Sequence, residues 1–188
     1  MTVKLVGSTS GSVSLQAPAS TTGGAHRVLT LPDVDGTVAV GDTGKILQVV
    51  QATKTDVQST TSTSYVDITG MSLNITPSAT SSKILLTGMV VIHHSLYTAF
   101  VRILRDSTEI GTSGTGSNSA YIVYNLNENA NQSRAINFLD SPNTTSQVTY
   151  KLQFKRDGGS TLYINAHTTG TTNDFISTSV LTAMEVAA

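Results

Sequence analysis

The chain has 188 residues, enough for one full domain and a smaller segment. Charged residues make up 12% of it and the formal net charge is −1, with no run of Lys or Arg. Nucleic-acid binding needs concentrated positive charge, so the composition argues against it. Cysteine is absent, which excludes disulfides and thiolate metal sites.

The composition favours strands over helices. Val, Ile and Thr are frequent, and clusters of Gly, Ser, Thr and Asn separate the apolar runs. Short strands at such spacing are typical of an all-β sandwich or barrel. No apolar stretch approaches the ~20 residues that span a bilayer, and the first residues lack the apolar core of a signal peptide. We therefore expect no membrane insertion, and assembly in a cytoplasm.

Residues 1–44 differ from the rest of the chain. Their short apolar groups are separated by small residues and Pro, and none is long enough to bury a core. We expect an extended N-terminal β-arm that lies against a sister chain or another protein. The candidate docking residues on this arm are Leu5, Val13, Leu15, Leu29, Leu31 and Val38.

Residues 45–188 are predicted to form one compact β domain. Its clearest strand is 148–155, where Val148, Tyr150, Leu152 and Phe154 alternate with polar residues, the pattern of a strand with one face in the core. Roughly eight to ten strands fit an antiparallel, jelly-roll-like β-sandwich. The expected strands are 46–52, 65–75, 83–94, 100–105, 109–110, 121–126, 135–139, 148–155, 162–166 and 176–186.

Residues 83–94 form the longest apolar run. A nearly continuous apolar strand is typically buried on both faces, whereas a sandwich usually covers one face. A homotrimer axis is the simplest cover for the second face. The candidate interface residues are Met89, Val91 and His93.

The pair His93 and His94 also raises a metal hypothesis. Adjacent strand residues face opposite sides, so the two cannot hold one ion as neighbours. A trimer axis could gather three copies of one of them into an imidazole site. We favour packing at the strand end instead, and we predict no cofactor.

No pattern in the sequence predicts catalysis. Cleavage of a glycan would need paired carboxylates, but Asp106, Asp140 and Asp157 stand in turn-like sequence, where Asp bonds its own following backbone. The many Ser residues lack the G-x-S-x-G turn of a nucleophile elbow. We therefore predict a protein that is not an enzyme.

The predicted loops carry the candidate recognition surface. They are rich in Ser, Thr, Asn and Gly with a few aromatic residues, a composition that suits a sugar or lipopolysaccharide surface and also ordinary solvated loops. The candidate host-contact residues are Tyr97, Tyr121, Tyr124, Arg156, Tyr163 and Phe175.

An ordered set of short stretches gives the chain a family resemblance. They read GKILQVVQ (44–51), YVDITGM (65–71), ITP (75–77), SKIL (82–85), LRDSTEI (104–110), TYKLQ (149–153) and LTAMEV (181–186). Together they resemble the C-terminal domain of fibre and tail-associated proteins of bacteriophages, especially those of marine bacteria. VSLQAPA (13–19) and LTLPDVDGTV (29–38) resemble the shaft or attachment stretches that precede such domains.

This resemblance implies a homotrimer in a virion, attached to other virion proteins through residues 1–44, with residues 45–188 as an outward-facing head. The strand order also resembles the trimeric jelly rolls of the complement C1q type, at the level of fold alone. Tail fibres usually carry a long shaft, which this chain almost lacks. A short tail fibre that contacts a host glycan and a capsid decoration or cement protein therefore both stay open.

Overall fold

The computed structural model describes the backbone of residues 2–6, 12–16, 44–93, 97–112, 120–125, 132–159, 161–168 and 173–187. Within these ranges, the side chains of residues 2–6, 12–16, 124–125, 167–168 and 173–175 are left out of the description. The chain divides into two compact units, Met1–Val40 (unit 1) and Gly41–Ala188 (unit 2). The sequence placed a boundary at residue 44, close to this division.

All regular structure in these described ranges is β-strand. No helix long and apolar enough to cross a membrane is found among them. Unit 1 contains β1 (Thr2–Val6) and β2 (Ser12–Gln16), which pair antiparallel. Unit 2 contains β3 (Ile46–Lys54), β4 (Gln58–Thr60), β5 (Val66–Ile75), β6 (Lys83–His93), β7 (Thr98–Arg105), β8 (Thr108–Ile110), β9 (Ile122–Asn125), β10 (Gln132–Asp140), β11 (Val148–Arg156), β12 (Leu162–Ile164), β13 (Ala166–Thr168), β14 (Asn173–Ile176) and β15 (Ser179–Val186).

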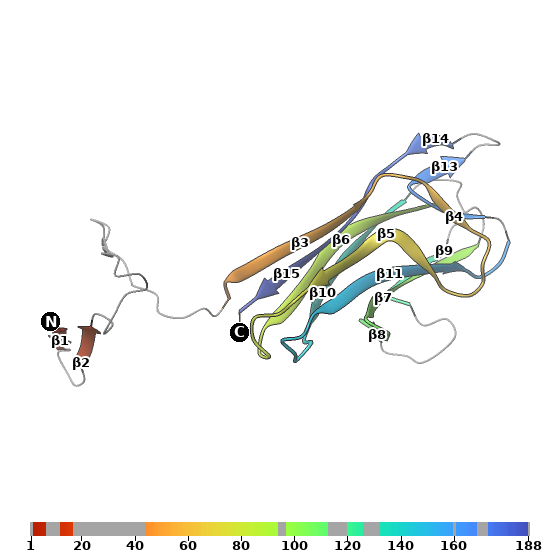
Figure 1. Cartoon of the computed structure of the whole chain (residues 1–188). Helices are drawn as coiled ribbons and strands as arrows, with labels where there is room; N and C mark the ends of the chain where they lie inside the picture. The colour runs from red at the N-terminus through yellow and green to blue at the C-terminus, as the bar shows by residue number, and fades with distance from the viewer. Residues whose placement is uncertain are drawn as a thin grey trace. The chain divides into compact units, whose positions relative to one another are not determined.

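Unit 2 is an antiparallel β-sandwich (Figure 1). In the first sheet, β6 pairs with β10 along one edge and with β15 along the other, and β3 pairs with β15. Beyond the end of β15, β12 takes its place beside β6 and pairs with β4. The second sheet has the order β5–β11–β7–β8, and β9 also pairs with β7. The predicted all-β, jelly-roll-like sandwich is confirmed.

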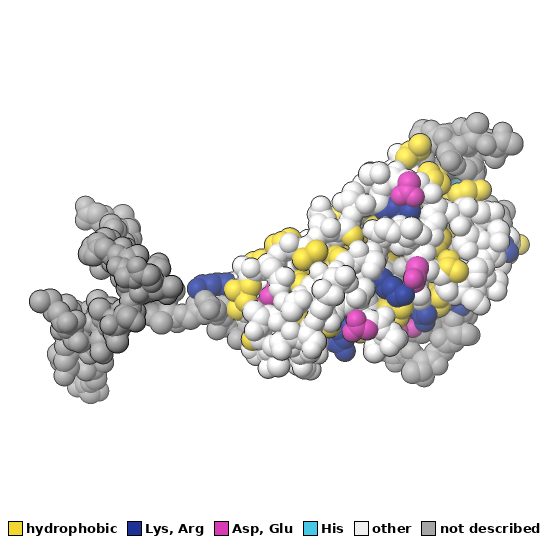
Figure 2. All heavy atoms as spheres, in the orientation of Figure 1, with side chains coloured by type: hydrophobic (Ala, Val, Ile, Leu, Met, Phe, Trp, Pro, Cys, Tyr) yellow, Lys and Arg dark blue, Asp and Glu magenta, His cyan; other side chains and the backbone are white. Residues whose placement is uncertain are grey.

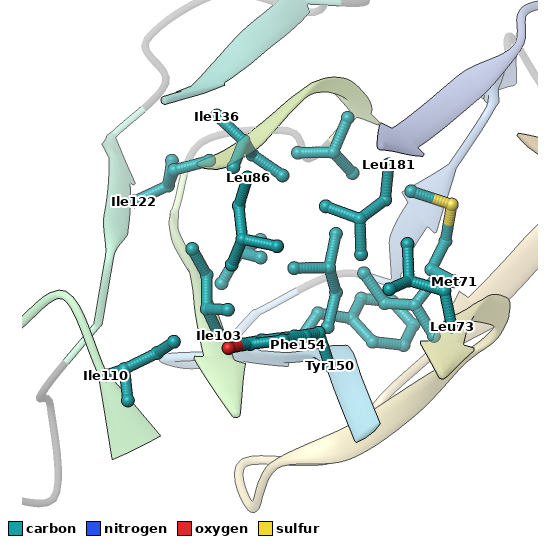
Figure 3. Close-up of a cluster of buried hydrophobic side chains, with 14 of the residues drawn as sticks. Met71, Leu73, Leu86, Ile103, Ile110, Ile122, Ile136, Tyr150, Phe154 and Leu181 are labelled. Atoms are coloured by element: carbon teal, nitrogen blue, oxygen red, sulfur yellow. The ribbon is translucent and has the colours of Figure 1, made fainter. Parts of the chain in front are cut away.

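The core lies between the two sheets and takes alternate residues from each strand. On β11 the predicted inward side chains, such as Leu152 and Phe154, are fully buried. Figure 3 shows Phe154 gathered in one cluster with Leu86 and Leu181 of the first sheet and Ile103 of the second. Each fully buried side chain of this size contributes roughly 1.5–3 kcal/mol, so the alternation fixes which face of each strand points inward.

A buried polar group joins the two sheets at the end of β10. Asp140 accepts a hydrogen bond from Tyr150 Oη at 2.6 Å, and its two oxygens lie 3.0 and 2.9 Å from an Arg105 nitrogen. Burial raises the pKa of Tyr150, and the bond to Asp140 raises it further. From the sequence, Asp140 was expected to be a turn residue that bonds its own following backbone. In the structure it is the last residue of β10 and accepts the hydrogen bonds that link β10 to β7 and β11.

A second buried polar group surrounds Asn165, between β12 and β13. Its backbone has φ +64°, a left-handed conformation that Asn tolerates. Its amide donates to the Lys54 carbonyl at 2.8 Å, and its Oδ1 accepts from Ser179 Oγ at 2.6 Å. Ser179 Oγ in turn accepts from the Val91 N–H at 2.9 Å. Leaving one of these buried groups without a partner costs about 1–3 kcal/mol, so the group fixes where β3, β6 and β15 meet.

Gly88 of β6 lies directly beside β15, and a Cβ added to it would fall 2.1 Å from the Val180 carbonyl oxygen. Because that atom is backbone and cannot turn aside, we expect Gly88→Ala to lower the free energy of unfolding by about 1–3 kcal/mol. Gly158→Ala is the matched control, since its nearest contact would be an ordinary 4.0 Å. Urea unfolding of both variants tests this, and an equal effect of the two would contradict it.

Candidate functional site

Unit 2 has two ends along its strands (Figure 1). At the entry end the chain runs into β3, and the Gly44 N–H donates to the Ala187 carbonyl at 2.6 Å. At the far end β11 finishes with Arg156 opposite Ala99 of β7, and Tyr163 of β12 pairs with the last residue of β6. Residues far apart in sequence therefore meet at each end.

Tyr97 is an exposed predicted host-contact residue at the far end, with 47% of its surface accessible. Its ring lies directly over the backbone of Gly159, where a Cβ would overlap it. Arg156 holds this turn, because its guanidinium donates to the Gly159 carbonyl and, through Nε at 2.6 Å, to the Thr61 carbonyl. The far end thus presents an aromatic ring on a turn fixed by hydrogen bonds to main-chain carbonyls.

The other predicted host-contact residues are spread over unit 2. Tyr163 is half-buried, with its ring centroid 6.0 Å from that of His93. Tyr121, just before β9, reaches the middle of β10, where its hydroxyl donates to the Asn137 carbonyl at 2.7 Å and accepts from the Asn137 N–H at 3.1 Å. Tyr97, Arg156 and Tyr163 are brought to the far end, and the backbone of Tyr124 also lies there, opposite Ala99. The side chains of Tyr124 and Phe175 lie outside the described residues.

The three predicted trimer-interface residues differ in accessibility. Met89 is 40% exposed, whereas Val91 and His93 are 4% and 3% exposed within a single chain. The Tyr163 ring lies beside His93, and the Val91 main chain bonds to Ser179 and Asn165, neighbours that the sequence did not reveal. A role of all three in a trimer stays a prediction, and Met89 is the one whose surface is open to a second chain.

Few of the residues predicted for virion docking or metal binding have side chains that the structure describes. Leu5 of β1 pairs with Val13 of β2, and Leu15 pairs with Val3. Leu29, Leu31 and Val38 lie outside the described residues, as does His94. Among the side chains that are described, no three His, Asp or Glu residues gather as metal ligands would.

The entry end contains a buried carboxylate that the sequence did not single out. Glu185 of β15 is 1% exposed. Its Oε1 accepts from the Ser78 N–H at 2.7 Å and the Ser78 hydroxyl at 2.6 Å, and its Oε2 accepts from Gln48 Nε2 at 2.6 Å. Burial alone would raise its pKa, but these hydrogen bonds outweigh burial and lower the pKa from 4.5 to about 2. The carboxylate joins β3, β15 and the turn after β5.

Glu185 makes stability depend on pH at the entry end. Its pKa is lower in the folded chain, so its ionised form stabilises the fold above about pH 4.5, and that contribution disappears as the pH falls towards 2. We expect Glu185→Gln to lose up to about 3 kcal/mol at pH 7 and progressively less at lower pH. Urea unfolding from pH 2 to pH 7 tests this. A constant difference between the two proteins over that range would contradict it.

Comparison with known proteins yields no family. No family model and no curated protein matches the sequence. Among solved structures, a chain of infectious bursal disease virus strain Gt is 18% identical with a TM-score of 0.41, covering 98% of this chain and 46% of that one. The VP2 subviral particle of infectious bursal disease virus is 16% identical with a TM-score of 0.41, covering 86% of this chain and 43% of that one. The chain spans less than half of these viral chains, and likeness at this level assigns no function.

Proposed function

We propose that the protein is a non-enzymatic structural component of a virus particle. Unit 1 attaches it to other virion proteins, unit 2 forms homotrimers, and the far end faces outward and contacts a glycan or lipopolysaccharide of the host bacterium. The ordered sequence resemblance to bacteriophage fibre and tail-associated proteins supports a role in a virus particle that is assembled in the host cytoplasm. The β-sandwich of unit 2 is compatible with such a role.

The polarity of unit 2 is the observation that carries the proposal. The chain enters at Gly44, beside Ala187, at one end of the strands. Tyr97 and Arg156 lie at the opposite end. The point where the chain enters the sandwich and the surface around Tyr97 thus lie at opposite ends of its strands, as an outward-facing appendage requires.

The chemistry of the far end suits a sugar ligand. An exposed aromatic ring offers an apolar face for the C–H groups of a pyranose, and Tyr also carries a hydroxyl for hydrogen bonding. Tyr97 meets this description and rests on a fixed turn, so little entropy is lost when it binds. The hydrogen bonds of Arg156 to two main-chain carbonyls make it the residue that positions the turn.

Replacing the ring tests the contact surface. We expect Tyr97→Ala to reduce adsorption of particles to the host bacterium by about tenfold, the loss of roughly 1.4 kcal/mol per site. Tyr97→Phe is the matched control and should keep most adsorption, because it keeps the ring. Particle yield and the amount of protein per particle should not change in either variant. Normal adsorption of Tyr97→Ala would favour the capsid decoration or cement role.

Removing unit 1 tests attachment. A chain that begins at Gly41 keeps the whole of unit 2. We expect it to be absent from purified particles, measured by immunoblot against a major particle protein, while the free protein keeps its β-sheet circular dichroism. Incorporation at the level of the full chain would contradict attachment through residues 1–40.

A further inference from the structure

The outer face of the first sheet carries three complete cross-strand rows. Pairing across β3, β15, β6 and β10 aligns one residue from each strand in every row. The neighbours of these residues along each strand, such as Leu86 and Leu181, point into the core, so the rows face away from it. The rows are Val49–Met184–Leu85–Leu139, Gln51–Thr182–Thr87–Asn137 and Thr53–Val180–Met89–Ala135.

None of these twelve residues carries a charge, and large apolar side chains lie open in the first and third rows. Val49 is 58% exposed, Leu139 55% and Met89 40%. The middle row is polar, and Gln51 donates to Thr182 Oγ1 at 3.0 Å. A partner for this face must therefore be mainly apolar and uncharged, with some capacity for hydrogen bonding.

The outer face of the second sheet has the opposite character. Lys151 Nζ lies 3.0 Å from Asp67, and Arg102 lies 3.1 Å from Glu109. In Figure 2 cationic and anionic side chains lie side by side over β5 and β11, while apolar side chains gather along β3. Covering these charges with an apolar partner would cost desolvation free energy, so the second face suits water and the first face suits a protein.

The edge strand β3 of the first sheet also has an open side that a partner could cover. β3 is nine residues long, and within the described part of the chain it pairs through one edge only. It carries exposed Ile46 and Leu47 and has no charge or Pro before Lys54. A long apolar edge of this kind leads to uncontrolled pairing between copies unless a defined contact covers it.

We propose that the outer face of β3, β15, β6 and β10 is the surface through which copies of this chain associate. The three rows carry no charge, so copies that meet through them around a three-fold axis experience no like-charge repulsion, and a closed ring covers the same edge in every copy. In flat projection the three rows span about 400 Å², roughly half of the ~800 Å² that each partner gives to a stable interface. The exposed side chains at the start of β3 extend that surface. This inference rests on the homotrimer in the proposed function and specifies its interface.

Two matched substitutions test the face. Val49 and Val123 are 58% and 60% exposed, but Val123 of β9 lies on the second sheet and faces away from the core. In light scattering at micromolar concentration, Val49→Asp and Leu139→Asp should reduce the mass to about one third of the wild-type trimer. Val123→Asp should keep the wild-type mass. High salt should leave the wild-type mass unchanged, because no charges hold the contact.

Cross-linking keeps the test valid if an Asp variant does not fold. The chain has no Cys, so Val49→Cys and Val123→Cys each introduce a single thiol. A bis-maleimide with a flexible spacer should join chains through Val49→Cys and not through Val123→Cys. Equal cross-linking of both, or wild-type mass in Val49→Asp and Leu139→Asp, would overturn this interface and leave the outward-facing role intact. A monomeric wild type would overturn the homotrimer as well, whereas adsorption of Tyr97→Ala tests the far end independently.

Discussion

The structure of unit 2 depends on the pairing of β6 along both of its edges. β10 follows one edge from Ile84 to Ile92, and β15 and then β12 follow the other. Every other strand of the first sheet is attached to β6 directly or through one neighbour. The inward side chains of β6 are fully buried between the sheets, so the same strand supplies the centre of the sheet and the centre of the core.

The outer face of β6 is buried near the far end and exposed near its middle. Near the far end, Val91 and His93 are buried within a single chain, with Tyr163 beside His93 and the Asn165 group bonded to the Val91 main chain. Near the middle, Met89 is left open beside the uncharged side chains of β3, β15 and β10. An apolar strand in a sandwich thus obtains part of its second cover from its own chain, and the proposed contact between copies would cover the remainder of that face.

Buried polar groups fix the register that apolar packing leaves loosely defined. A strand could slide by two residues and still bury the same kinds of side chain. Asp140 with Tyr150, and Glu185 with Ser78 and Gln48, each require one particular alignment of strands from different parts of the chain. Their hydrogen bonds make the alignment specific, because any other would leave a buried charge without partners.

The sequence by itself determined the fold class and most strand positions. Alternation such as that of Val148 to Phe154 reflects a local period of two, which exists whatever the strand packs against. It also identified 83–94 as an unusual strand with two apolar faces, and it named Tyr97 and Arg156 among the candidate host-contact residues. These features depend on neighbours in sequence and on side-chain chemistry, which the chain displays directly.

Only the tertiary structure decided which distant residues meet. Asn165 pairs with Lys54 across 111 positions and Glu185 with Ser78 across 107, and neither pair leaves a local pattern. The division of the predicted host-contact residues between the far end and the middle of β10, and the burial of Val91 and His93, follow from strand order in the two sheets. That order is set by the balance of long-range pairing over the whole chain, which no short stretch of sequence contains.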